Sequence, residues 1–397
     1  MKPSGRPRRW LVLGVFVLST AINYLDRQTL ATLAPLLRAE FHLSNTDYGF
    51  LLTAFSITYA ISAPFAGLLI DSIGLNRAIS LAVTVWSCSG IWTGFTSGMA
   101  GLTGCRAVLG LSEAAGIPAA GKAIHQYLLP SERALGNALN QAGVSLGLVL
   151  APPIATWIAV AYGWRNAFVV TGLLGLLWIP VWNVVAARFG GIHQPARQPI
   201  FSGTELLRHS RLWAFVAANA LSMTGYSLWT NWTTTYLVDV HHLTLVQAAW
   251  FAWIPPLFAT AGGVAGGWYS QYLMRRGVEA VTARTRACAT SSVLALASAL
   301  VPVLPGPAWA SAGISLSIFA VAAFSVNMYT MPLDTFGGAR AAFATSILVA
   351  SYGGVQALAS PAFGAIIDAR GYTPVCLLVS FLPLAAYGIL KGTEAPA

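Results

Sequence analysis

Long apolar runs follow one another along almost the whole chain, and short polar segments separate them. Each run holds roughly the 20 apolar residues that an α-helix needs to cross a lipid bilayer. The pattern therefore predicts about twelve membrane-spanning helices. We expect them near residues 10–34, 47–70, 78–96, 99–121, 134–160, 166–187, 212–237, 246–273, 286–304, 308–331, 342–367 and 374–390.

The composition supports a membrane protein. Hydrophobic residues make up 56% of the 397 residues, and charged residues make up only 9%. A soluble domain carries about 25% charged residues, so this chain has too little polar surface to cover a water-soluble globule. The four cysteines lie in apolar segments and lack the spacing of metal ligands. We predict no metal site and no cofactor.

The basic residues indicate which segments face the cytoplasm. If the N-terminus is cytoplasmic, most Lys and Arg fall in inside segments, and the outside loops hold only Arg38, Arg165 and Arg370. Cytoplasmic loops carry an excess of Lys and Arg, so this asymmetry fits an even number of spans with both termini in the cytoplasm. The net charge of +10 has the same explanation, and we expect no nucleic-acid partner.

The longest polar stretch separates the sixth and seventh predicted spans, and similar segments recur on its two sides. We expect an N-terminal six-helix half at 1–187, a central cytoplasmic linker at 188–211 and a C-terminal six-helix half at 212–397. Nearly equal offsets between matching residues indicate a duplicated six-span unit. The matching pairs are Gly67 and Gly267, Arg133 and Arg340, and Gly163 and Gly371, with offsets of 200, 207 and 208 residues.

Four charged residues lie inside predicted spans, where charges are costly and usually functional. Asp26 and Arg27 are adjacent in the first span, and Arg106 and Glu113 lie on one face of the fourth, about two helical turns apart. Tyr24 shares a helix face with Arg27, because the two are three residues apart. Two acids and two arginines can neutralise one another, which makes burial tolerable. Permanent ion pairs that only hold the two spans together are the alternative interpretation.

A motif after the second span carries a family resemblance. Gly67, Asp71, Gly74 and Arg77 are similar to the signature G-x-x-x-D-x-x-G-x-x-R of the major facilitator superfamily. The second copy of this loop lacks its acid, because Gln271 stands there. The resemblance implies an all-α membrane protein with about twelve transmembrane helices in two pseudo-symmetric six-helix halves, which is the major facilitator fold.

Within that superfamily the chain resembles the anion:cation symporters, which move organic anions such as sugar acids together with protons. The matching segments are NYLDR at 23–27, CRAVLGLSEA at 105–114, PSERALGNA at 130–138 and YGWRNAF at 162–168. The resemblance implies that Arg27 helps to bind the anion, for which the planar guanidinium is suited. It also implies that Asp26 and Glu113 carry the coupled proton, while Arg106 exchanges partners between the acids.

The resemblance also implies residues for the rest of the substrate site and for gating. Tyr24, Tyr59 and Gln141 match positions that the family uses for sugar-acid hydroxyl or carboxylate groups. Trp232 and Gln356 are added because they are polar groups in apolar spans, and packing is the alternative for Trp232. Four residues near the cytoplasmic ends of spans are expected to gate the pathway, with topology signals and helix caps as the alternative. They are Asp71, Arg77, Arg133 and Arg340.

We predict a proton-coupled symporter that imports a small organic anion by alternating access. The anion would be a sugar acid, such as a hexuronate or an aldonate, or another carboxylate. A proton-driven exporter of amphipathic small molecules is the alternative, and a receptor or membrane enzyme is a third possibility without a catalytic motif to support it. We expect a monomer in the cytoplasmic (inner) membrane of a bacterium, with the anion, protons and membrane lipid as its partners.

Overall fold

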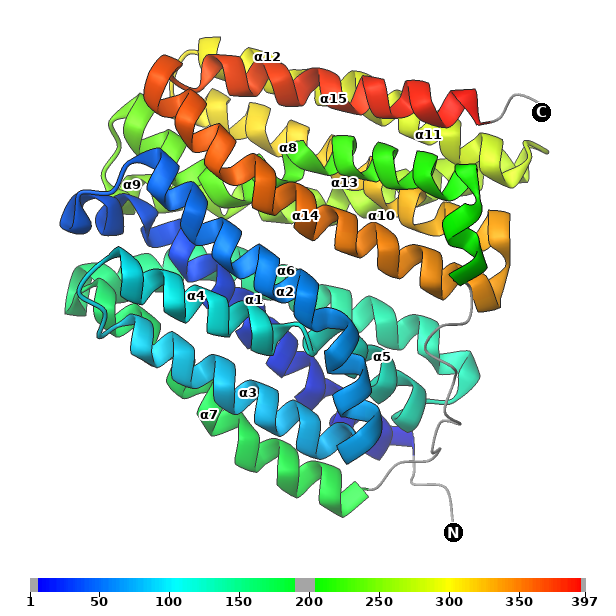
Figure 1. Cartoon of the computed structure of the whole chain (residues 1–397), viewed down its shortest axis with the longest axis horizontal. Helices are drawn as coiled ribbons and strands as arrows, with labels where there is room; N and C mark the ends of the chain where they lie inside the picture. Colours follow the sequence, from blue (N-terminus) through cyan, green and yellow to red (C-terminus); the bar gives the residue numbers. More distant parts are fainter. Residues whose placement is uncertain (1–5, 190–203, 394–397) are drawn as a thin grey trace. The chain divides into compact units, whose positions relative to one another are not determined.

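The computed structural model describes residues 6–189 and 204–393, and this part of the chain contains helices and no strands. Most of the predicted linker at 188–211 therefore lies outside the described residues. The first helices are α1 (Arg6–Phe41), α2 (Asn45–Ile73), α3 (Leu75–Thr93), α4 (Met99–Glu113), α5 (Gly116–Tyr127), the short 3₁₀ helix η1 (Pro130–Glu132), α6 (Arg133–Tyr162) and α7 (Trp164–Phe189) (Figure 1). The fourth predicted span is thus interrupted, because two residues separate the end of α4 from the start of α5.

The later helices continue the same pattern. They are η2 (Thr204–Arg208), α8 (Ser210–His241), α9 (Leu245–Ala252), α10 (Ile254–Arg275), α11 (Ala280–Ala295), α12 (Ala297–Leu300), η3 (Val301–Val303), α13 (Pro307–Phe336), α14 (Gly338–Arg370) and α15 (Thr373–Gly392). Each predicted span corresponds to one helix or to one run of consecutive short helices.

Seven helices in the described part are long and apolar enough to cross a membrane, or up to eight if α2 is counted across its 51° bend. Other predicted spans are also helical but fall short in length or in apolar content. For example, α4 has only 15 residues, and the middle of α1 carries Asp26 and Arg27.

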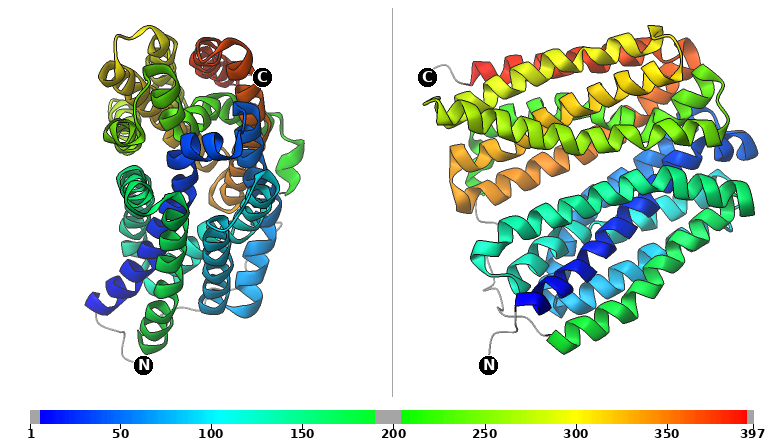
Figure 2. Two further views of the ribbon diagram at one scale, coloured as in Figure 1. Left: turned by 90° about the vertical axis from the view of Figure 1, so that its left-hand side faces the viewer. Right: turned by 180° about the vertical axis from the view of Figure 1, so that it is seen from behind.

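The helices form two compact units. The first unit contains α1 and the chain from Phe50 through α7, and in it α1 packs along α6 and α7 while α3 packs along α7. The second unit contains η2 to α15 together with Ser44–Gly49 at the start of α2. In this unit α13 packs along α10, and α8 packs along α15 and α14 (Figure 2).

The start of α2 belongs to the second unit because α14 holds it. The Asp368 carboxylate accepts hydrogen bonds from the backbone N–H groups of Asn45, at 3.1 Å, and Thr46, at 2.9 Å. It also accepts from the two side chains, at 2.8 and 2.7 Å. The first N–H groups of a helix have no partner within the helix, so Asp368 satisfies groups that need an external acceptor.

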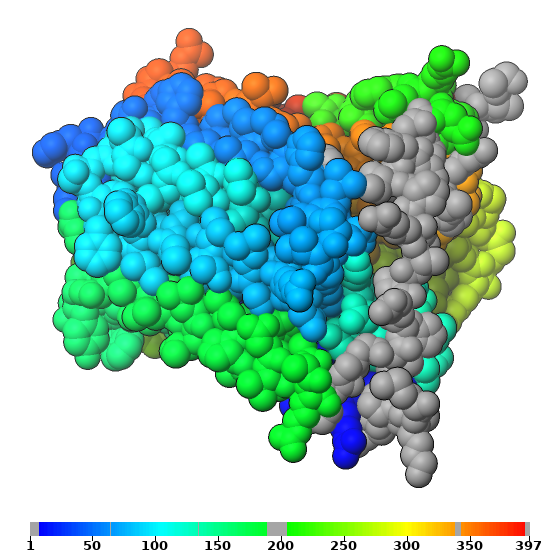
Figure 3. Space-filling model, turned by 60° about the horizontal axis from the view of Figure 1, so that its bottom comes forward, coloured from blue at the N-terminus to red at the C-terminus, as the bar shows by residue number. Residues whose placement is uncertain are grey.

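Large apolar side chains remain exposed on the outer faces of the helices. Ile61 and Phe65 on α2, Trp92 on α3, and Leu177 and Val184 on α7 are each more than 60% exposed. Figure 3 shows the side of the first unit where these three helices lie at the surface. A soluble monomer rarely exposes apolar patches of this kind, whereas lipid covers them in a membrane protein.

Candidate functional site

Arg27 of α1 and Glu113 of α4 form an ion pair in the first unit. Arg27 Nη2 lies 2.7 Å from Glu113 Oε2, and Arg27 Nε donates to the same oxygen at 2.9 Å. The other carboxylate oxygen, Oε1, is buried and has no hydrogen-bond partner among the described residues. The Glu113 side chain is fully buried, while the Arg27 side chain is 26% exposed. Part of the arginine of this pair is therefore accessible, whereas the carboxylate is not.

Three aromatic rings surround the Arg27 guanidinium. Its central carbon lies 4.8 Å from the ring centre of Tyr24, 4.7 Å from that of Phe55 and 5.2 Å from that of Tyr59. A cation over an aromatic face gains about 0.5–2 kcal/mol, depending on how far it is desolvated. The rings therefore hold the guanidinium in place while leaving it charged. Both tyrosines are among the residues predicted from the sequence, but Phe55 is not, because a phenylalanine in an apolar span carries no distinguishing signal.

Glycines bring the helices of this site close together. A methyl group added to Gly110 of α4 would overlap the Phe55 carbonyl of α2, so α4 can approach α2 only without a side chain there. A methyl group on Gly147 of α6 would likewise overlap the Ala21 carbonyl of α1, one turn before Tyr24. These close approaches place Glu113 beside the aromatic rings and fix the backbone that carries Arg27.

Asp26 lies beside the ion pair but has a different environment. It is 2% exposed, and Thr171 Oγ1 of α7 donates to its Oδ1 at 2.7 Å. Arg106, which is 4% exposed, and Arg27 both act on Asp26 electrostatically. The structure thus brings together all four charged residues that the sequence places inside the first and fourth spans. The sequence analysis missed Thr171, because one threonine in an apolar helix has many possible roles.

The other predicted substrate residues are on α6, α8 and α14. Gln141 is exposed on α6, and its backbone carbonyl accepts a hydrogen bond from Ser145. Trp232 is fully buried in the second unit, where its ring packs edge-on against Tyr48 at 4.9 Å. Gln356 is half-buried on α14. Within the first unit, the aromatic and charged cluster around Arg27 is therefore the part of the predicted site that the structure assembles.

Asp71, one of the predicted gating residues, forms an ion pair with Lys122. Lys122 Nζ on α5 lies 2.5 Å from Asp71 Oδ1 and also donates to the Ile70 carbonyl at 3.2 Å. The sequence analysis did not single out Lys122, although the chain has only three lysines and the other two lie near its ends. Lys122 follows directly after the predicted fourth span, which is the signal that could have identified it.

The remaining predicted gating residues also lie near helix ends. Arg77 is exposed in the first turn of α3, and Arg133 begins α6. The neighbouring Glu132 forms an ion pair with Arg9 of α1 at 3.2 Å. Arg340 lies near the start of α14, and its side chain lies outside the part of the chain whose side chains are described.

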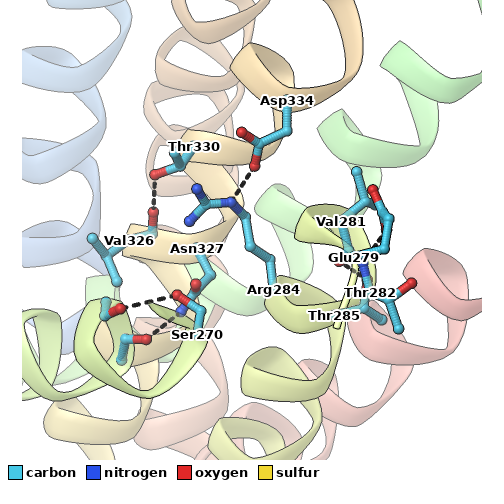
Figure 4. Close-up of polar contacts among 12 residues, drawn as sticks. Ser270, Glu279, Val281, Thr282, Arg284, Thr285, Val326, Asn327, Thr330 and Asp334 are labelled. Carbon is cyan, nitrogen blue, oxygen red and sulfur yellow. Dashed lines mark hydrogen bonds and ion pairs between the residues drawn. The ribbon is translucent and has the colours of Figure 1, made fainter. Parts of the chain in front are cut away.

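The second unit carries its own polar contacts between helices (Figure 4). Arg284 of α11 forms an ion pair with Asp334 of α13, and Asn327 Nδ2 donates to the Gly266 carbonyl of α10 at 3.0 Å. Glu279 precedes α11 and accepts from the backbone N–H of Thr282 at 2.9 Å. Hydrogen bonds from backbone N–H groups hold the pKa of Glu279 below its usual value, because they favour the carboxylate.

Known proteins similar to this chain are membrane transporters. The sequence matches the family described as the Major Facilitator Superfamily over residues 16–348. The hexuronate transporter of Escherichia coli strain K12 is 26% identical over 401 residues, which cover 96% of this chain and 92% of that protein. The galacturonate transporter of Dickeya chrysanthemi is 28% identical over 278 residues, which cover 66% of this chain and 81% of that protein.

The fold has a counterpart among solved structures. A bacterial homologue of the human lysosomal transporter Spinster, in an inward-facing and occupied conformation, superposes with a TM-score of 0.80 and covers 99% of this chain and 100% of that chain. The two sequences are 19% identical, so this likeness concerns the fold alone. The predicted fold class is confirmed. The family and the relatives that match this chain are transporters and not enzymes. Because the family match covers well over half of the chain, the protein belongs to the Major Facilitator Superfamily of membrane transporters.

Proposed function

We propose that the protein is a proton-coupled symporter that imports a small organic anion, such as a hexuronate or another sugar acid. The names of its relatives support this substrate class, because those that match over most of the chain include a hexuronate transporter. The observation that carries the proposal is the ion pair between Arg27 and Glu113. An accessible arginine paired with a buried acid can bind either an external carboxylate or its internal one.

The pair provides a physical route to coupling. While Glu113 is charged, it occupies two N–H groups of Arg27. When Glu113 takes up a proton, its attraction for the guanidinium falls, and Arg27 can donate both N–H groups to the carboxylate of a substrate. Proton binding therefore strengthens anion binding, and by thermodynamic linkage anion binding strengthens proton binding to the same degree. When Glu113 is protonated, the carboxylate of the substrate replaces it as the partner of Arg27, so the charge of Arg27 stays balanced while the loaded transporter changes conformation.

The other predicted residues complete this proposal. Asp26 holds a second proton, and Arg106 compensates whichever acid is charged. Substrate contacts come from residues around Arg27 and from the C-terminal half, and gating contacts form at the cytoplasmic ends of the helices. We assign the substrate contacts to Tyr24, Tyr59, Gln141, Trp232 and Gln356, and the gating contacts to Asp71, Arg77, Arg133 and Arg340. The transporter works as a monomer with six-helix halves at 1–187 and 212–397, and both termini face the cytoplasm of a bacterial cell.

Uptake into proteoliposomes tests the proposal. The purified full-length chain is reconstituted, an inward proton gradient is imposed, and labelled glucuronate, galacturonate, galactonate and glucarate are supplied in turn. We expect gradient-driven uptake of at least one of these acids. Arg27→Ala should abolish that uptake, because the anion loses its charged partner. Glu113→Gln should retain exchange of labelled for unlabelled substrate and should weaken the dependence of net uptake on the proton gradient, because one of the two proton sites is lost.

Matched variants separate function from folding. Arg165 and Glu40 form an ion pair of the same kind at 2.6 Å, but about 40% of each side chain is exposed. Arg165→Ala and Glu40→Gln should leave uptake and its proton dependence close to wild type. The symporter is contradicted if no acid is taken up while lipophilic dyes move outward, which would favour the exporter. Uptake that survives both site variants would mean that the buried pair only holds α1 and α4 together.

A further inference from the structure

The hydrogen bond from Thr171 to Asp26 has a competing acceptor. Thr171 Oγ1 lies 2.7 Å from Asp26 Oδ1 and 3.1 Å from the backbone carbonyl of Phe168, one turn earlier on α7. A threonine hydroxyl carries one proton and two lone pairs, so it donates to one of these oxygens at a time and can accept a further bond. Thr171 is 1% exposed, so water does not replace either partner.

The surroundings give Asp26 few other partners. Its second oxygen, Oδ2, is buried and has no hydrogen-bond partner among the described residues. On α3, Gly90 faces the carboxylate, and a Cβ at that position would lie 3.1 Å from each carboxylate oxygen. The absence of a side chain at Gly90 leaves room for the carboxyl group to carry a proton. A buried polar group without a hydrogen-bond partner is destabilising, so the Thr171 hydroxyl matters in either protonation state.

The charges around Asp26 come from α1 and α4. Arg106 and Arg27 attract a negative charge on it, and Glu113 repels one. Gly90 of α3 and Thr171 of α7 also face it, and both are uncharged. Thr171 is thus the contact from α7 that responds to the proton on Asp26 by hydrogen bonding instead of by charge.

We propose that Thr171 is a positioning residue that reverses its hydrogen bond when Asp26 gains or loses a proton. When Asp26 is charged, the Thr171 hydroxyl donates to Oδ1. When Asp26 is protonated, the carboxyl O–H donates to Thr171 Oγ1, and the hydroxyl proton turns to the Phe168 carbonyl. No proton passes between the two residues, because the proton on Asp26 comes from the aqueous phase and each hydroxyl proton stays on its own oxygen.

This reversal gives both states of Asp26 a hydrogen-bond partner. It also lets the Thr171 hydroxyl donate to the Phe168 carbonyl only when Asp26 is protonated. The hydrogen bonding within α7 therefore depends on whether Asp26 of α1 carries a proton. The inference rests on the proposed function, in which Asp26 carries a proton during transport. It can be tested without substrate, so its failure is distinguishable from a failure of the transport proposal.

Infrared difference spectroscopy of the full-length chain in lipid membranes tests the reversal. A protonated carboxyl group gives a C=O stretching band that appears as the pH is lowered, and Asp26→Asn assigns the band to Asp26. In Thr171→Val the side chain keeps its shape but loses its hydroxyl. We expect the pH midpoint of the band to rise by about 1 unit, because hydrogen bonds to a charged group are roughly twice as strong as neutral ones. The band itself should shift in frequency, because the protonated carboxyl group has lost its acceptor.

Two further variants make the result decisive. Thr171→Ser keeps the hydroxyl and should restore both the midpoint and the frequency, which a purely steric role of the threonine would not predict. Thr285→Val removes the same group from a buried threonine on α11 that donates to the Val281 carbonyl at 3.0 Å, and it should change neither value (Figure 4). The proposal is overturned if Asp26 shows no titrating band between pH 4 and 9, or if Thr171→Val has the midpoint of wild type. If Thr171→Val does not fold, a Thr171→Ser protein whose band differs from wild type in both values overturns the proposal.

Discussion

At the scale of single residues, the two oxygens of the Glu113 carboxylate differ in their hydrogen bonding. One oxygen accepts both N–H groups of Arg27, and the other has no partner in the described part of the chain. Residues of this kind could be found from the sequence, because a charge inside an apolar run stands out against its neighbours. Thr171 could not, because its contact depends on a chain segment 145 residues away. A threonine is not unusual in an apolar helix.

The geometry at Arg27 predicts that lysine cannot replace it. In Arg27→Lys the positive charge stays, but the planar pair of N–H groups and the stacking against three rings are lost. One charge-assisted hydrogen bond is worth about 1.5–3 kcal/mol, so we expect the KM for uptake to rise by roughly ten- to hundredfold. Initial rates of uptake at several substrate concentrations measure this change. Arg165→Lys is the control, and an unchanged KM in Arg27→Lys would show that charge alone binds the anion.

At the scale of helices, the duplication indicated by the sequence is visible in how the helices end. His42 follows α1 with a φ of 52°, and His242 follows α8 with a φ of 54°. Non-glycine residues seldom adopt positive φ, yet here two of them lie 200 residues apart, at the offset seen between Gly67 and Gly267. The two halves therefore share a local geometry that their residue types only partly preserve.

Contacts between helices repeat in the same way. Tyr127 of α5 donates to Asn76 of α3 at 3.2 Å, and Asp334 of α13 pairs with Arg284 of α11. Asp334 lies 207 residues after Tyr127, and Arg284 lies 208 residues after Asn76, so the two pairs correspond, but one is a hydrogen bond and the other an ion pair. Sequence comparison of the halves misses this equivalence, because the position is kept while the chemistry changes.

Two glycines on α4 predict a contrast within one helix. In Gly110→Ala the methyl group meets the α2 backbone, whereas in Gly104→Ala it meets nothing within 4 Å. Overpacking of this kind costs about 1–3 kcal/mol, so Gly110→Ala should lower the thermal unfolding temperature and reduce uptake. Gly104→Ala should leave both close to wild type. Thermal unfolding in detergent and uptake in proteoliposomes give the two measurements, and equal behaviour of the variants would contradict this account of α4 packing.

At the scale of the whole molecule, the chain is a membrane transporter whose predicted spans each correspond to helical structure. This agreement has a simple cause, because the thickness of the bilayer fixes the length of each apolar run. Helices such as α1 and α14 extend several residues beyond their predicted ends, since nothing in the apolar pattern records where a helix stops outside the lipid. The apolar pattern also does not predict the interruption between α4 and α5, because Ala114 and Ala115, which separate these helices, are themselves apolar.

The pair of buried acids predicts how the whole cycle responds to voltage. If Asp26 and Glu113 each carry a proton with one singly charged anion, every turnover moves one net positive charge inward. A charge crossing the membrane gains about 2.3 kcal/mol per 100 mV, so an inside-negative potential should accelerate uptake. A potassium gradient with valinomycin sets the potential in proteoliposomes that have equal pH on both sides. This acceleration should disappear in Glu113→Gln. A wild-type uptake rate that does not depend on the membrane potential would contradict the two-proton cycle.

The enclosure of Arg27 by Tyr24, Phe55 and Tyr59 has a consequence for the shape of the ligand. Rings that lie 4.7–5.2 Å from the guanidinium carbon restrict access to its faces, and Glu113 occupies one of its edges. The other edges of the guanidinium suit a flat group that approaches in the plane of the guanidinium, as a carboxylate does. A phosphate or sulfate ester has oxygens above and below that plane and would have to push the rings apart. In the proposed symporter these aromatic residues would act as a steric filter for planar anions, in addition to holding the charge that attracts them.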